Sequence, residues 1–153
     1  MTELTVRAYE PQDFVDIKVS ERVQETREGQ PVQMWATYHK ARGPALTFID
    51  PKGRVVVCAG VHHFWEGSGE VWFVLSPLAK VYPRTGACVR SLIAYCQKVL
   101  GYKRLQLAVR EDWPEAVRLA EYLGFRKEVV MKNYGPNGVD QTLYALVEEA
   151  ANV

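Results

Sequence analysis

The stretch LSPLAKVYPRTGACVRSLI, residues 75–93, joins the end of an apolar strand to an amphipathic helix. Gly86 lies at the predicted start of this helix, and Lys80 and Arg84 lie in the segment before it. The first backbone N–H groups of a helix have no partner within it, and the helix dipole adds partial positive charge there. A glycine lets an anion approach the backbone closely. The joint is therefore a candidate anion site, and the alternative is an ordinary helix start in which Gly86 eases a turn.

Four side chains around the predicted central strands could accept a proton. Glu70 begins one strand, and Glu66 lies in the turn before it. His62 and His63 are adjacent in the preceding strand, so their side chains face opposite sides of the sheet. An imidazole there could act as a base near neutral pH. The alternative interpretations are solvated turn residues for the two glutamates, and packed or surface residues for the two histidines.

The first half of the chain supplies the elements that must position these residues. Alternating apolar and polar residues predict a strand over 4–9. After Pro11, the residues Val15, Val19 and Val23 recur every four positions and predict one helix of roughly a dozen residues. An aromatic helix over 32–41 and three antiparallel strands over 45–50, 54–65 and 70–76 follow.

The helix after the joint has an apolar stripe at a spacing of three and four residues. Gly101 is expected to end this helix. The stripe consists of Val89, Leu92, Ile93, Cys96, Val99 and Leu100.

The remainder of the chain is predicted to form a strand over 103–109, a helix and two final strands over 126–134 and 140–148. Asp112 and Glu115 have the spacing of a capping box at the start of that helix. Its apolar face contains Ala116, Leu119, Ala120 and Leu123, and Gly124 ends it. The two late strand–helix units require part of the sheet to be parallel.

Composition limits the class of protein. The chain has 153 residues, of which 48% are apolar, so we expect a single domain over 1–153. The formal net charge of +1 argues against a nucleic-acid binder. Three cysteines without a C-x-x-C pattern predict neither a disulfide framework nor a metal site, and they favour a reducing, cytoplasmic location. The polar N-terminus is not that of a signal peptide, and no apolar run is long enough to span a membrane.

The predicted order, β-α-α-β-β-β-α-β-α-β-β, resembles the GNAT superfamily of acyl-CoA N-acyltransferases over nearly the whole chain. The sharpest local match is DWPEAVRLAEYLGF, residues 112–125, which is similar to the fourth helix of the family, N-P-x-A-x-x-L-Y-x-x-L-G-F. The segment order also resembles GNAT-like proteins of tailed bacteriophages. The resemblance implies an α/β fold with a mixed, mostly antiparallel sheet flanked by helices. It also implies acyl transfer, with acetyl-CoA as cosubstrate, to an unknown amine.

The same resemblance assigns the joint to coenzyme A. In the family it carries Q/R-x-x-G-x-G/A, and its N–H groups hold the pyrophosphate. Here Pro83 takes the Gln/Arg position and Cys88 the second glycine position, so the match is partial. The backbone of the strand before the joint would pair with the pantetheine arm. The implied cofactor-binding residues are Phe73, Val74 and Leu75 in that strand and Arg84, Thr85, Gly86, Ala87 and Cys88 at the joint.

The resemblance also assigns roles in catalysis, and the sequence departs from it at two positions. Many family members have an acid tyrosine where this chain has Ala120, and an asparagine where it has Trp113. Glu70 and His63 remain as candidate bases, and Tyr134 could replace the missing acid. Tyr122 cannot simply do so, because two residues along a helix rotate a side chain by about 200°.

These departures predict weak acyl transfer and leave other functions open. One alternative is an inactive GNAT-derived module, related to phage proteins, that binds acyl-CoA or acts by protein interaction. Another is a plain interaction domain in which the joint is only a turn. A homodimer is left open as the assembly, and a membrane partner is not expected.

Overall fold

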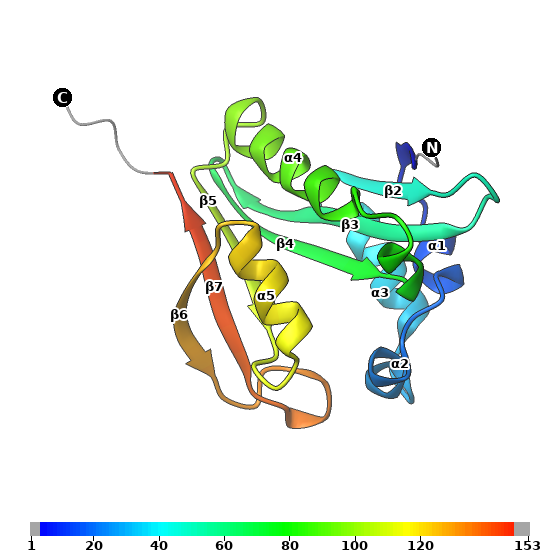
Figure 1. Ribbon diagram of the computed structural model, residues 1–153. Coiled ribbons are helices and arrows are strands. Elements are labelled where there is room, and N and C mark those ends of the chain that lie inside the picture. The colour runs from blue at the N-terminus through cyan, green and yellow to red at the C-terminus, as the bar shows by residue number, and fades with distance from the viewer. Residues whose placement is uncertain (1–3, 149–153) are drawn as a thin grey trace. The chain divides into compact units, whose positions relative to one another are not determined.

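The computed structural model describes residues 4–148, and Figure 1 shows their arrangement. The strands are β1 (Thr5–Ala8), β2 (Ala45–Ile49), β3 (Val55–Trp65), β4 (Ser68–Leu75), β5 (Arg104–Val109), β6 (Arg126–Met131) and β7 (Gln141–Val147). The α-helices are α1 (Pro11–Asp16), α2 (Glu21–Arg27), α3 (Val32–Ala41), α4 (Thr85–Lys98) and α5 (Pro114–Tyr122). Two short 3₁₀ helices, η1 (Pro77–Lys80) and η2 (Pro136–Gly138), complete the order.

The strands form a mixed sheet in the order β1-β2-β3-β4-β5-β7-β6. The pairs β1–β2, β2–β3, β5–β7 and β6–β7 are antiparallel, and β4–β5 is parallel. The parallel pair is the one joined through a helix, α4, because only a long crossover can return the chain in the same direction. The predicted fold class, a mixed and mostly antiparallel sheet with helices, is confirmed.

The chain divides into two compact units. The first contains the chain up to His63 together with Val71–Thr85, and the second contains Phe64–Glu70 together with the chain from Gly86 onward. Strand β4 therefore contributes residues to both units, and α4 begins at the last residue of the first. None of the helices in residues 4–148 has the length and apolar character needed to cross a bilayer.

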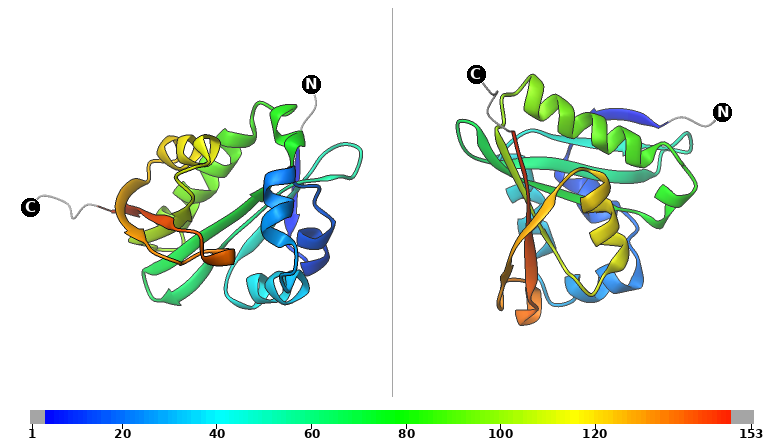
Figure 2. Two further views of the ribbon diagram at one scale, coloured as in Figure 1. Left: turned by 90° about the horizontal axis from the view of Figure 1, so that it is seen from below. Right: turned by 60° about the vertical axis from the view of Figure 1, so that its left-hand side comes forward.

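The first unit has its core between the early helices and the strands. Figure 2 shows α1, α2 and α3 grouped together within this unit. The Tyr9 hydroxyl donates a hydrogen bond of 2.8 Å to the carbonyl of Ala36, which ties β1 to α3. The buried residues of this core are Tyr9, Phe14, Ile17, Ala36, Cys58 and Trp72.

The prediction of one helix after Pro11 is wrong, because the structure has two. Helix α1 ends at Asp16, and its C-cap, Ile17, leaves the helical conformation with a ψ of 127°. Helix α2 then begins at its own cap, Ser20, whose hydroxyl accepts a 3.3 Å hydrogen bond from the N–H of Val23. A serine favours this position over a helix interior. The valine repeat therefore spans two helices with a break between them.

In the second unit, α5 packs against β5, and Ala120, Leu123 and Phe125 are buried. Gly124 ends α5 with a φ of +95°, as the sequence predicted. The predicted N-cap is wrong: the N-cap of α5 is Trp113 and not Asp112, and Trp113 makes no side-chain capping hydrogen bond. The Asp112 carboxylate instead accepts hydrogen bonds of 3.0 and 2.6 Å from Arg110.

Helix α4 confirms most of its predicted stripe and corrects its end. Val89, Ile93 and Cys96 are buried. The helix ends at Lys98, so Val99 and Leu100 lie beyond it and are exposed. Their inclusion in the buried stripe is wrong. The turn after the helix closes with Gly101 at a φ of +78° and a hydrogen bond from the N–H of Tyr102 to the carbonyl of Cys96.

Candidate functional site

The N-terminus of α4 lies where the sequence predicted an anion site. The N–H and the hydroxyl of Thr85 both donate to the carbonyl of Tyr82, at 3.0 and 2.7 Å. The first bond within the helix uses the N–H of Cys88. The N–H groups of Gly86 and Ala87 are left without a carbonyl in their own helix, at the positive end of a helix of 14 residues. These two amides form the core of the candidate site.

The segment that leads into α4 is anchored by a buried carboxylate. Asp50, in the turn between β2 and β3, accepts a 3.0 Å hydrogen bond from the Tyr82 hydroxyl. It also accepts hydrogen bonds from the N–H groups of Lys52 and Arg54 and from the Arg54 side chain. Burial would raise the pKa of Asp50, but the hydrogen bonds from Arg54 and Tyr82 hold it at about 2. The charged carboxylate therefore fixes Tyr82, and Tyr82 fixes the start of α4.

Gly86 has a neighbour that the sequence did not indicate. A Cβ atom on Gly86 would lie 3.4 Å from Cε2 of Tyr122, the last residue of α5. The guanidinium carbon of Arg90 lies 5.2 Å from the centroid of the same ring. The ring of Tyr122 therefore flanks the first turn of α4. No local pattern could have predicted this contact, because it joins two helices that are far apart in sequence.

Ala120 and Tyr122 face different surroundings, as the helical geometry predicted. Ala120 is fully buried, whereas Tyr122 is 45% exposed. The methyl group of Ala120 cannot act as an acid, and its position has no free surface around it.

Glu70 lies in the parallel pair of strands, opposite Gln106. The Gln106 amide donates a 3.1 Å hydrogen bond to the Glu70 carboxylate. The amide oxygen of Gln106 accepts from Arg104, and Arg104 also donates to Glu128 at 3.1 and 2.6 Å. This network orients Glu70, and sequence reasoning missed Gln106 as its partner. The alternation of β5 could have indicated it, because Gln106 is a polar position between the buried residues Leu105 and Leu107.

The two adjacent histidines have different environments. His63 is exposed, and its backbone N–H donates a hydrogen bond to the carbonyl of Arg42. His62 is buried, and its Nε2 lies 2.8 Å from Nδ1 of His39, which stacks on Trp72. Burial lowers the pKa of His39 to about 3 and that of His62 to about 4. The His39–His62 pair is therefore neutral at pH 7.

Tyr134 is not brought to Glu70 by the strand register. Glu70 is level with Gln106, and Gln106 is level with Ala145 of β7. Tyr134 follows β6, whose last residue, Met131, pairs with Gln141 at the other end of β7. Four residues along a strand span about 13 Å. Tyr134 is 51% exposed, and its role as an acid stays a prediction.

The remaining predicted residues flank the start of α4 along the chain. Phe73, Val74 and Leu75 are half-buried at the end of β4. The strand ends at Ser76-Pro77, where the Ser76 hydroxyl accepts a 3.1 Å hydrogen bond from the N–H of Leu78. The exposed cations there are Lys80 in η1 and Arg84 directly before α4.

The large aromatic residues of α3, β3 and β4 and the one after β6 differ in their exposure. Trp72 is buried, and Trp35 packs against the same core. Tyr38, Trp65 and Tyr134 are at least half exposed.

No protein-family model and no curated protein matches the sequence. Solved structures do match. A GNAT-family acetyltransferase from Bacillus anthracis gives a TM-score of 0.72 at 18% identity and covers 98% of each chain. A chimeric spermidine N-acetyltransferase from Vibrio cholerae gives 0.73 at 16% identity, over 94% of this chain and 95% of that chain.

A ribosomal-protein-S5-alanine acetyltransferase from Vibrio fischeri gives a TM-score of 0.68 at 16% identity, over 98% of this chain and 96% of that chain. The chain has the GNAT fold. The GNAT resemblance drawn from the strand and helix order is thereby confirmed at the level of the fold. At these identities the GNAT likeness extends to the fold alone, and the likeness to phage proteins stays a prediction.

Proposed function

We propose that this chain transfers an acyl group, in the simplest case acetyl, from acyl-CoA to an amine. The GNAT fold supports the reaction class, because the structures that share it over nearly the whole chain are acetyltransferases. One of them is a spermidine N-acetyltransferase, which supports an amine as the acceptor.

The observation that carries the proposal is the first turn of α4. Gly86 and Ala87 have amides without helical partners at the positive end of this helix, and Lys80 and Arg84 precede it. A diphosphate is well suited to such a position, because backbone N–H groups and the helix dipole both favour an anion. The turn fits coenzyme A in this respect. Gly86 adds no side chain of its own, and the side on which its Cβ would lie faces the ring of Tyr122.

Coenzyme A supplies an activated thioester and a thiolate leaving group. In the chain itself, Gly86 and Ala87 would hold the pyrophosphate, and backbone groups of Phe73 to Leu75 would pair with the pantetheine arm. Glu70, held by Gln106, would accept the proton that the amine must lose. His63 is the second candidate for this role.

Protonation of the leaving thiolate lacks an evident side chain. Ala120 has no acidic group, Tyr122 flanks Gly86, and Tyr134 lies toward the other end of β7. Water would then supply the proton. General acid catalysis is typically worth about 10²–10⁴-fold in rate, so we expect slow turnover.

A steady-state assay for free CoA tests this function. The purified chain is mixed with acetyl-CoA and a panel that includes a polyamine, an amino acid and a peptide N-terminus. We expect release above the hydrolysis background with at least one amine, at a kcat below the common enzyme value of about 10 s⁻¹. Glu70→Gln should reduce that rate, and Glu66→Gln is the matched control in the adjacent turn. Absence of amine-dependent release across the panel would contradict acyl transfer.

A further inference from the structure

Arg27, the last residue of α2, has a buried side chain with an unused donor. The residue is only 8% exposed, and it is the buried residue of α2. Its Nη1 donates a 3.0 Å hydrogen bond to the carbonyl of Phe14, and the guanidinium lies 4.3 Å from the centroid of the Phe14 ring. Its Nη2 is buried and has no hydrogen-bond partner. A buried donor of this kind is uncommon and requires an explanation.

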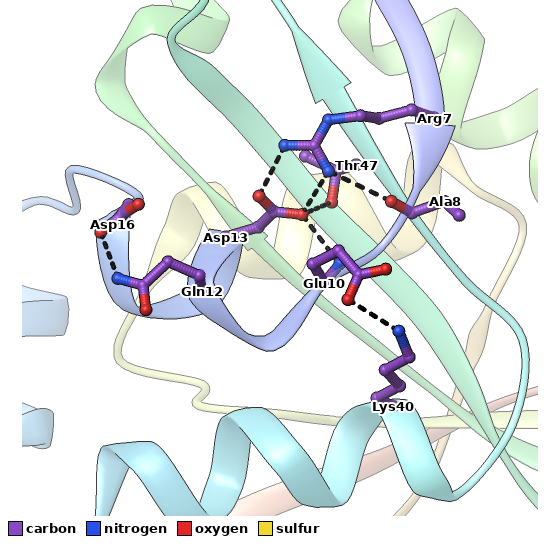
Figure 3. A network of polar contacts seen from close by, with 8 residues as sticks. All are labelled: Arg7, Ala8, Glu10, Gln12, Asp13, Asp16, Lys40 and Thr47. Carbon is purple, nitrogen blue, oxygen red and sulfur yellow. Dashed lines mark hydrogen bonds and ion pairs between the residues drawn. The ribbon is translucent and has the colours of Figure 1, made fainter.

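The buried acid next to Phe14 in the chain, Asp13, does not compensate Arg27. The carboxylate of Asp13 accepts hydrogen bonds of 2.7 and 2.6 Å from Arg7, 2.8 Å from Thr47 and 2.9 Å from the N–H of Glu10. Figure 3 shows these four contacts converging on Asp13. Its charge is therefore paired with Arg7. Between residues 4 and 148, no carboxylate forms an ion pair with Arg27.

The Cys58 thiol and the Tyr9 hydroxyl, which act electrostatically on Arg27, carry no negative charge at pH 7. Burial raises the pKa of the Cys58 thiol to about 12, and it also raises the pKa of Tyr9 above its ordinary value. Burial holds His39 and His62 in their neutral forms. Burial also lowers the pKa of Arg27, but a guanidinium in a protein stays protonated. Arg7, Asp13 and Arg27 thus leave this core with one positive charge in excess.

A buried cation without a counter-charge is unfavourable, because it loses hydration that its contacts with Phe14 replace only in part. A bound anion would supply both the missing charge and the missing acceptor. Only one Nη is unused, and the guanidinium lies on an aromatic ring. The site therefore fits one oxygen of a singly charged ion with an apolar body better than it fits a phosphate.

We propose that Arg27 is the binding residue for a small carboxylate, with its Nη2 donating to one carboxylate oxygen. The residues of this site belong to the first unit, and the proposal does not depend on acyl transfer. The carboxylate could belong to a free organic acid or to an amine that carries a carboxyl group. Both share the chemistry that Arg27 recognises.

Binding requires α2 to move, since Nη2 is covered. Helix α2 has seven residues, and Arg27 is the one that is buried. The chain after it turns at Gly29, which has a φ of +72° and open space on the side where a side chain would lie. A short helix with one buried side chain can shift without disrupting the rest of the core.

Thermal unfolding of the full chain without CoA tests the site. The additives are sodium acetate, glycine and ethylamine hydrochloride, each compared with sodium chloride at the same ionic strength and pH. We expect a saturable rise in melting temperature with acetate and with glycine, and none with ethylamine. Glycine above acetate would assign the site to an amine that carries a carboxylate, and equal responses would assign it to a free carboxylate.

Substitutions of Arg27 test whether this residue binds the carboxylate. Arg27→Met should lower the acetate affinity at least tenfold while the chain stays folded, and Arg27→Lys should keep a weaker response. Arg118→Met, an exposed arginine of α5, is the matched control and should respond like the wild type. A wild-type response to acetate no greater than that to chloride would overturn the proposal, and so would an unchanged response in Arg27→Met. The comparison of acetate with chloride uses the wild type alone. Neither this comparison nor the response of Arg27→Met depends on CoA turnover.

Discussion

The hydroxyl of Tyr82 donates a 3.0 Å hydrogen bond to the buried carboxylate of Asp50, which lies 32 residues earlier in the chain. Through this bond, the turn between β2 and β3 holds the segment that starts α4. The carbonyl of Tyr82 accepts two hydrogen bonds from Thr85. These bonds fix the chain up to Thr85, the first residue of α4.

The first prediction concerns this anchor. Tyr82→Phe removes the hydroxyl and keeps the ring, so the start of α4 should be held less firmly. We expect a lower melting temperature and a several-fold weaker affinity for acetyl-CoA. Tyr95→Phe, at an exposed tyrosine of α4, is the control. A Tyr82→Phe variant with wild-type affinity would show that the bond does not position the site.

The second prediction concerns the apolar face of α5. The sequence assigned Leu119 and Leu123 equally to the core, but Leu123 is 4% exposed and Leu119 is only half-buried. Leu123→Ala should lower the free energy of unfolding by about 2–5 kcal/mol, because it leaves a cavity. Leu119→Ala should have a smaller effect. Chemical denaturation of the two variants gives the comparison, and the reverse order would mean that α5 packs on another face.

The third prediction concerns the neutral histidine pair. The pKa values of His39 and His62 are lowered to about 3 and about 4, below the ordinary value of 6.5, so the unfolded chain binds protons first as pH falls. Their contribution to stability is complete above pH 6.5 and is lost as the pH falls toward 4. The expected slope is at most about 1.4 kcal/mol per pH unit for each histidine. Denaturation at pH 7.5, 6.5 and 5.5 should show this loss in the wild type.

Two variants show whether the histidine pair causes this pH dependence of stability. His62→Gln should flatten the pH dependence, whereas His63→Gln, at the exposed neighbour, should leave it unchanged. An equal slope in all three proteins would exclude the pair as its source.

The fourth prediction concerns Ala120. The sequence suggests that a tyrosine at this position should raise any measurable rate if the cleft has kept its shape. Because Ala120 is fully buried, Ala120→Tyr should also overpack the core and lower the free energy of unfolding by about 1–3 kcal/mol. Denaturation and the free-CoA assay should be run on the same preparation, with Ala120→Ser as a small control. Unchanged stability in Ala120→Tyr would mean that the surroundings open easily.

The sequence predicted the elements whose pattern is local. The bounds of α3 and the glycine end of α5 follow from residues that favour or stop a helix within one turn, whereas α4 ends at Lys98, before Gly101. The break between α1 and α2 was missed because the valine repeat continued across Ser20. The cap of α5 was missed because Arg110 competes for the carboxylate of Asp112.

Only those parts of the candidate site that are neighbours in sequence could be predicted. Gly86 and the cations before it are local features of one joint. The contacts of Gly86 with Tyr122, of Tyr82 with Asp50 and of Glu70 with Gln106 join residues at least 32 positions apart. Such contacts depend on the packing of whole elements, so a single sequence does not contain them as a pattern.

Calorimetric titration of acetyl-CoA into the wild type and Gly86→Ala tests the role of α4 most directly. The added methyl group fits beside Tyr122 at ordinary contact distance, and alanine favours a helix over glycine by up to about 1 kcal/mol. The variant should therefore be at least as stable as the wild type but bind acetyl-CoA at least tenfold more weakly, because the methyl group narrows the space between the Gly86 amide and the ring of Tyr122. Ser91→Ala, at an exposed position of the same helix, should bind like the wild type. Absence of binding by the wild type, or equal affinity in Gly86→Ala, would contradict coenzyme A binding at this helix.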